Sequence, residues 1–187
     1  MSARPAQRPS SGAVWAALIV ALVWLVDTHH PASPPPGRPR PSSSSTRPPA
    51  GLTFTNGAGC RPAGDYASPQ LDRRVRVLLV AIAAHHAVRV SCIRTGHSWH
   101  VRGTRRVSNH SVWRAVDVDQ VDGRPVSPSN TAARELARWI GQGTGVRPSE
   151  VGSPWAFGRR PWFTDPGHRD HLHVGFPGPT QAQGGGR

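Results

Sequence analysis

The sequence contains no lysine, so all 23 of its basic residues are arginines, and only ten of its 187 residues are acidic. The resulting charge of +13 is compatible with a nucleic acid, an anionic cell wall or a lipid surface as partner. Proteins that bind nucleic acids usually cluster their basic residues and interleave them with aromatics. Here the arginines are scattered from Arg4 to Arg187, so we expect no nucleic-acid partner.

Cysteine is also scarce. Cys60 and Cys92 are too few for a disulfide-rich scaffold or a structural zinc knuckle, and they leave one disulfide or two free thiols. The compartment decides between these alternatives, because disulfides persist in oxidising environments. In an exported domain we expect the two cysteines to pair, which would contribute about 3 to 4 kcal/mol by closing the intervening loop.

Charge is absent from residues 12–26, GAVWAALIVALVWLV, which follow an arginine-bearing start. As a helix this segment would rise about 22 Å, less than the roughly 30 Å hydrocarbon core of a bilayer. We therefore expect residues 1–27 to be a secretory signal or, since no clear cleavage motif follows, an uncleaved membrane anchor. Either reading places the rest of the chain outside the cytoplasm, secreted or anchored and facing the cell wall.

Residues 28–50 are rich in proline and serine, which predicts an extended linker without a core. We expect a folded domain over residues 51–177 and a disordered tail over residues 178–187. Apolar spacing predicts a helix that begins with Ser68 as its N-cap and a second helix within residues 127–142. Alternation predicts strands at residues 88–93, 115–123 and 171–176. The expected buried helical residues are Leu71, Val75, Leu78, Leu79, Ile82, Ala133, Leu136, Ala137 and Ile140. Strands and helices without a regular parallel repeat indicate a small α+β domain.

Histidines and an aspartate supply the candidate chemistry. His171 and His173 are two residues apart on a predicted strand, so their side chains point to the same face. His110 and Asp117, with one of this pair, make a set of two imidazoles and one carboxylate. Catalytic zinc sites use three protein ligands of these types and keep one position for water. Asp119 and Asp122 are expected to belong to the strand end and the turn.

The segment SNHSVWRAVD, residues 108–117, resembles the SxHxxGxAxD signature of the zinc D-Ala-D-Ala peptidase superfamily, which includes the peptidase M15 family and the hedgehog fold. The HLH of residues 171–173 resembles its second signature. The likeness covers roughly residues 58–177, and the chain resembles exported members from high-GC bacteria. It implies a small, mainly antiparallel sheet flanked by helices, with zinc in a cleft on the sheet.

The resemblance also implies roles for single residues. His110, Asp117 and His173 match the zinc ligands, and Ser108 matches a serine that holds the substrate near its terminal carboxylate. Arg94 lies where the family often has an arginine that stabilises charge on the substrate.

The general base can be assigned in two ways. Many members of the family use a glutamate at the position of Asp170, whereas others use the first histidine of HxH. Because strand alternation places His171 on the face of His173, we expect His171 to be the base or a transition-state stabiliser, with Asp170 as its hydrogen-bond partner. His97 and His168 could line the cleft, although loop positions favour solvated side chains.

One residue departs from the signature, because Trp113 stands at the position of its glycine. Glycine would permit an unusual backbone angle, so tryptophan predicts a narrowed or reshaped cleft.

The function that the resemblance implies is cleavage of peptidoglycan stem peptides, first as a D-alanyl-D-alanine carboxypeptidase and next as an endopeptidase. The alternative is a non-catalytic module on the same fold that binds the cell wall.

Overall fold

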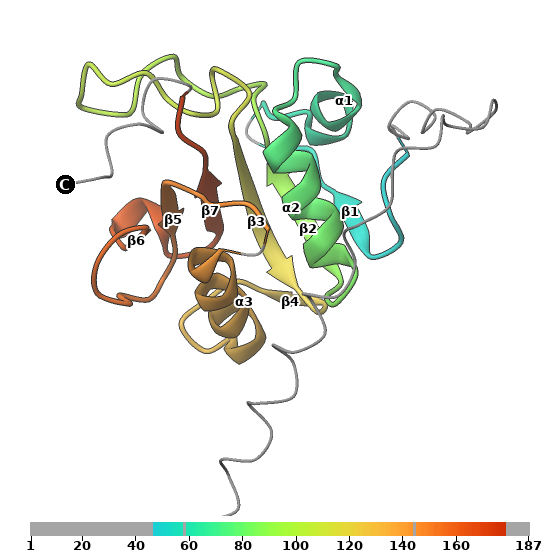
Figure 1. Ribbon diagram of the computed structural model, residues 1–187, viewed down its shortest axis with the longest axis vertical. Helices are drawn as coiled ribbons and strands as arrows, with labels where there is room; N and C mark the ends of the chain where they lie inside the picture. Colours follow the sequence, from blue (N-terminus) through green and yellow to red (C-terminus); the bar gives the residue numbers. More distant parts are fainter. Residues whose placement is uncertain (1–46, 58, 144, 179–187) are drawn as a thin grey trace, which may run out of the picture. The chain divides into compact units, whose positions relative to one another are not determined.

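Seven strands form one mixed sheet in the order β1-β2-β3-β7-β5-β6, with β4 paired to β3 (Figure 1). The computed structural model describes residues 47–57, 59–143 and 145–178. The strands are β1 (Leu52–Phe54), β2 (Val88–Cys92), β3 (Ala115–Val121), β4 (Arg124–Pro125), β5 (Glu150–Gly152), β6 (Trp162–Phe163) and β7 (Leu172–Gly175). The three predicted strands correspond to β2, β3 and β7, which lie side by side at the centre of the sheet.

The sheet is mixed rather than simply antiparallel. Pairings of β2 with β3, β3 with β4, β3 with β7 and β5 with β7 are antiparallel. At the edges β1 runs parallel to β2, and β6 runs parallel to β5. The α+β class is confirmed, and the expected mainly antiparallel sheet is a mixed sheet with a parallel pair at each edge.

Two helices cover one face of the sheet: α2 (Arg73–Ala83) and α3 (Thr131–Gln142) both lie in front of it in Figure 1. All nine residues expected to be buried helical positions are buried, although one of them, Leu71, lies just before α2. They belong to one core with alternate residues of the strands, such as Val116 and Val118 of β3 and Leu172 and Val174 of β7. Because side chains alternate across a strand, Asp117 and His173 face away from the helices.

The first long helix begins later than predicted. Asp72, not Ser68, is its N-cap, and the Asp72 carboxylate accepts a hydrogen bond from the backbone N–H of Arg74. Ser68 instead ends the short helix α1 (Pro62–Ala67) as its C-cap, which the sequence pattern did not reveal. For α3 the N-cap is Asn130, whose side chain accepts from Ala133 N–H.

The connection between β2 and β3, residues 93–114, is fixed at its start. Cys60 and Cys92 form a disulfide, the pairing expected if the domain is exported. Asp65 of α1 is buried, and its carboxylate accepts from the backbone N–H groups of Arg94 and Thr95. These contacts hold the loop that carries His110 beside the end of β2.

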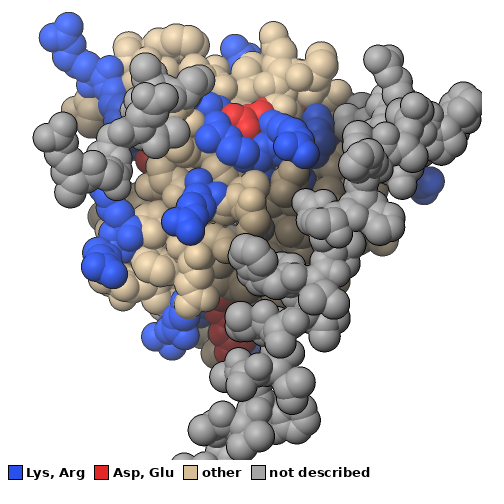
Figure 2. Space-filling view, viewed as in Figure 1, with Lys and Arg blue, Asp and Glu red and all other residues tan. Residues whose placement is uncertain are grey.

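Several predictions from the sequence fall mainly on residues outside the described ranges. These are the signal or anchor at residues 1–27, most of the linker at residues 28–50 and most of the tail at residues 178–187. Among the described residues no helix has the length and apolar character needed to cross a membrane. Figure 2 shows the arginines of the helix-covered face as separate groups rather than one continuous patch.

Candidate metal centre

Three buried side chains bring their ligand atoms together on the sheet face opposite the helices. Asp117 and His173 are cross-strand partners in the pairing of β3 with β7, and His110 reaches them from the loop before β3. His173 Nδ1 lies 3.0 Å from both Asp117 Oδ1 and His110 Nε2, and His110 Nε2 lies 3.2 Å from Asp117 Oδ1. A tetrahedral zinc site with ligand distances of about 2.0 Å has edges of about 3.3 Å. The three side chains can therefore hold a metal ion.

A hydrogen bond on the ring nitrogen remote from the other two ligands fixes the orientation of His110. Its Nδ1 is hydrogen-bonded to the carbonyl oxygen of Ile93, and its side chain is 2% exposed. Because a carbonyl oxygen only accepts, the proton lies on Nδ1 and the lone pair of Nε2 faces Asp117 and His173. This is the tautomer that a metal ligand needs.

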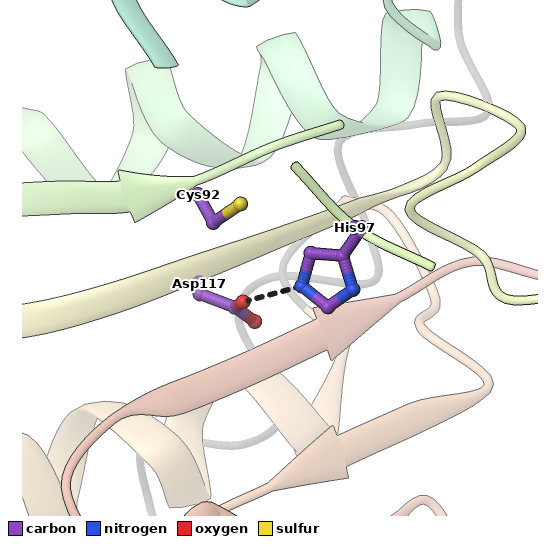
Figure 3. Close-up of side chains that lie close together, drawn as sticks. All are labelled: Cys92, His97 and Asp117. Atoms are coloured by element: carbon purple, nitrogen blue, oxygen red, sulfur yellow. Dashed lines mark hydrogen bonds and ion pairs between the residues drawn. The ribbon is translucent and has the colours of Figure 1, made fainter. Parts of the chain in front are cut away.

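A second group of potential ligands, Cys92, His97 and Asp117, shares the aspartate (Figure 3). His97 Nε2 lies 3.4 Å from Asp117 Oδ2, and its ring stacks on that of His110 at 3.7 Å between centroids. Cys92 is in the disulfide with Cys60, so it offers no thiolate, which is the form that binds metals. In the oxidised protein this group therefore lacks its third ligand, whereas His110, Asp117 and His173 remain complete.

Asp117, His110 and His173 shift one another's pKa values. Burial opposes ionisation of Asp117, but the charge that His110 carries when protonated and hydrogen bonds from the neighbouring histidines hold the pKa of Asp117 well below its ordinary value. Burial lowers the pKa of His110. For His173 burial acts in the same direction, but hydrogen bonds and charges from Asp117 and Glu150 outweigh it and raise its pKa to about 9. Without a metal, His173 is thus the cation that balances the two carboxylates.

This raised pKa predicts opposite effects of pH on the metal-free and the metal-loaded protein. A raised pKa in the folded state contributes stability below the unfolded value of 6.5, and that contribution is lost as pH rises through about 9. The urea concentration at the unfolding midpoint of the metal-free protein should therefore decrease as pH rises from 6.5 to about 9. A metal needs the neutral imidazole, so the stabilisation by added zinc should grow over the same interval. Parallel urea titrations with chelator and with zinc measure both trends, and a zinc effect that does not depend on pH would contradict them.

A cavity of about 950 Å³ opens at the three ligands and includes Ser108, His171, His97 and His168 in its lining. The Ser108 hydroxyl is buried and accepts from the backbone N–H of His110. His171 Nε2 lies 3.9 Å from Asp117 Oδ1. His97 and His168 both line the cavity; His97 is exposed in its loop, as expected, whereas His168 is half-buried.

Asp170 and Arg94 lie outside the cavity lining. Asp170 is largely exposed, but its Oδ1 lies 2.8 Å from Nδ1 of His171, as expected for a hydrogen-bond partner. The guanidinium of Arg94 lies over the ring of Trp113, at 5.2 Å from its centroid. The structure thus brings Ser108 and His171 to the cavity, and it places Arg94 against Trp113 instead.

Trp113 adopts a φ of +64°, a left-handed conformation that suits the glycine of the signature. Its backbone accepts from Asp72 N–H and donates to the His110 carbonyl, so this turn is tied to α2 and to the candidate ligand. Its ring does not line the cavity. Of the expected narrowing or reshaping of the cleft, narrowing by the Trp113 ring is wrong, because the ring lies against Arg94.

Glu150 is the main residue of the site that sequence reasoning missed. Its Oε1 lies 3.2 Å from Nε2 of His173, and Asn109 and Arg106 donate to its two carboxylate oxygens. Burial would raise the pKa of Glu150, but the hydrogen bond and charge of His173, with smaller effects of Asn109 and Arg106, lower it to about 2. The available signal was weak: Glu150 is one of two glutamates in the chain, and β5 is three residues long.

Asp119 and Asp122 have the structural roles expected from the sequence. Asp119 forms a bidentate ion pair with Arg89 of β2. Asp122 and Gly123 make the turn between β3 and β4, both at positive φ, and the Asp122 carboxylate contacts His86. Of the three neighbouring aspartates, only Asp117 belongs to the candidate metal centre.

Comparisons with models of protein families, with curated proteins and with solved structures find no match to this chain.

Proposed function

We propose that the protein is an exported zinc peptidase that cleaves stem peptides of peptidoglycan, with the terminal D-Ala-D-Ala bond as the first candidate. The observation that carries this proposal is the triangle of His110 Nε2, Asp117 Oδ1 and His173 Nδ1, with edges of 3.0 to 3.2 Å. Two imidazoles and one carboxylate at the wall of an open cavity leave room for water and a peptide carbonyl. Bound zinc would supply Lewis acidity and an activated water there.

His171 would move the proton. Its Nδ1 is held by Asp170 Oδ1 at 2.8 Å, so its Nε2 is the nitrogen that lies toward Asp117. A carboxylate on one ring nitrogen fixes the orientation of the imidazole and leaves the other nitrogen to exchange the proton with water and the leaving amine. The buried hydroxyl of Ser108 lies next to His110 and would hold the peptide end.

His171→Ala should lower kcat by about 100-fold to 10,000-fold, the usual range for loss of a general acid or base. Zinc content should not change, because His171 does not belong to the ligand triangle. Asp170→Asn keeps the imidazole of His171 but weakens the hydrogen bond that orients it. It should therefore lower kcat less than His171→Ala does. Steady-state kinetics on a synthetic stem peptide would measure both, and an active His171→Ala variant would remove this residue from the mechanism.

The charge-stabilising role implied for Arg94 is better suited to another arginine. Arg102 and Arg106 line the cavity and Arg94 does not, while Arg106 is paired with Glu150. Arg102→Ala should therefore raise KM for a peptide with a free carboxylate, by roughly 10-fold for one lost charged hydrogen bond. Arg94→Ala is the matched control from the same loop and should change KM little. A larger increase in KM for Arg94→Ala than for Arg102→Ala would instead assign Arg94 the role that the resemblance implies.

Digestion of purified sacculi by the zinc-loaded protein, followed by mass analysis of the released peptides, tests the proposal. Loss of a single terminal alanine indicates a carboxypeptidase, and separated cross-links indicate an endopeptidase. Retention on the sacculus without cleavage would favour the alternative, a non-catalytic module that binds the wall. Cleavage by the parent but not by His171→Ala excludes a contaminating enzyme.

A further inference from the structure

Glu150 lies behind the candidate metal ligand His173. Its Oε1 is 3.2 Å from Nε2 of His173, whereas Nδ1 of the same ring faces Asp117 Oδ1 at 3.0 Å. The side chains of Glu150 and His173 are 15% and 10% exposed. Two carboxylates therefore hold the two nitrogens of one buried imidazole, and only Asp117 lies on the side of the other ligand, His110.

Glu150 is itself held in place by two donors. Asn109 Nδ2 donates to Oε1 at 2.6 Å, and a guanidinium nitrogen of Arg106 donates to Oε2 at 2.9 Å. Asn109 directly precedes His110 in the chain. One carboxylate from β5 thus contacts both the segment that carries the first ligand and the ring of the third.

The fold also keeps space for this carboxylate. Gly175 of β7 is the cross-strand partner of Glu150. A Cβ at Gly175 would lie 2.5 Å from Glu150 Oε1 and 2.9 Å from Asn109 Nδ2, and such approaches require the carboxylate to move. The absence of a side chain at residue 175 is therefore an independent sign that the position of Glu150 depends on this space.

We propose that Glu150 is a positioning residue of the metal site: it accepts the Nε2–H of His173 and so presents Nδ1 to the metal. This inference rests on the proposed zinc site. A carboxylate behind a ligating histidine fixes its tautomer and ring orientation, and loss of such a partner typically weakens metal affinity by about 10-fold to 100-fold. His110 is held in the corresponding way by the carbonyl of Ile93.

The test is the zinc affinity of the full chain, measured by competition with a chromophoric chelator, for Glu150→Ala, Glu150→Gln and Gly175→Ala. The first should weaken affinity by about 10-fold to 100-fold, and Gln, which keeps an acceptor oxygen, should restore part of the loss. Gly175→Ala should also weaken affinity although it removes no charge. Asp165→Asn is the matched control, because Asp165 holds His168 Nδ1 at 2.8 Å in the same cavity but His168 is outside the ligand triangle.

Nitrogen NMR of the His173 ring gives a readout that a merely structural role would not move. In the zinc-loaded parent the proton should lie on Nε2, and in Glu150→Ala the Nε2–H signal should exchange faster with water or the other tautomer should appear. Folded Glu150→Ala and Gly175→Ala proteins that bind zinc as tightly as Asp165→Asn would overturn the proposal while leaving the metal site in place. If Glu150→Ala does not fold, Glu150→Gln and Gly175→Ala decide in the same way. A parent that binds no zinc would instead overturn the proposed function.

Discussion

Replacing His110 with alanine should abolish stoichiometric zinc binding and lower the proposed peptidase activity by about 1,000-fold or more. His110 supplies one corner of the ligand triangle, and its loss leaves only two protein ligands, one fewer than a catalytic zinc site uses. A catalytic metal contributes several kcal/mol of transition-state stabilisation, and about 4 kcal/mol corresponds to that loss of rate. Metal analysis of the dialysed protein and kinetics on a stem peptide measure the two effects.

Two variants separate loss of the ligand from loss of the fold. His110→Asn keeps a donor for the Ile93 carbonyl, which accepts from His110 Nδ1 in the parent, but it has no nitrogen at the Nε2 position. His100→Ala removes an exposed histidine that lines the same cavity and should leave one zinc per chain. A His110→Asn protein that still binds one zinc with the affinity of the parent would remove His110 from the site.

Removal of the disulfide by the double replacement of Cys60 and Cys92 with alanine should destabilise the protein by about 3 to 4 kcal/mol. The two cysteines are 32 residues apart, and an open loop of that length adds entropy to the unfolded chain. Urea unfolding of the parent and the double variant, both with a chelator present, measures the difference.

The double variant is preferable to a single one because it leaves no free thiol beside the ligands. With Cys60→Ala alone, Cys92 could bind a metal together with His97 and Asp117, whose ligand atoms lie close by (Figure 3). A midpoint that does not change in the double variant would show that the bond does not stabilise the fold. Zinc affinity should change little, because neither cysteine belongs to the ligand triangle.

Long periodic segments of the fold could be predicted from the sequence, and short ones could not. The apolar spacing in α2 and α3 identified every buried residue of these two helices, because each helix presents one stripe to the core. The strands β1 and β6 contain three and two residues, which is too short for an alternating pattern. These strands make the two parallel pairs, so the mixed character of the sheet was not visible in the sequence.

The ligand set could be proposed from local patterns, but the residues that support it could not. Alternation placed His171 and His173 on one face of a predicted strand, and the structure pairs His173 with Asp117 across β3 and β7. Glu150 reaches His173 from β5, 23 residues earlier in the chain, and no local pattern reports such a contact. Arg94 was predicted to act at the site but does not line the cavity. Its cation–π contact with Trp113 depends on a backbone turn that sequence spacing does not specify.

The most direct test of the zinc site is X-ray absorption at the zinc edge on the oxidised, zinc-loaded full chain. A zinc ion held by His110, Asp117 and His173 should have only nitrogen and oxygen neighbours at about 2.0 to 2.2 Å, with two imidazole signatures. Sulfur at about 2.3 Å would mean that Cys92 is a ligand, in place of the intact disulfide. That result, or a spectrum of zinc surrounded by water alone, would contradict the account.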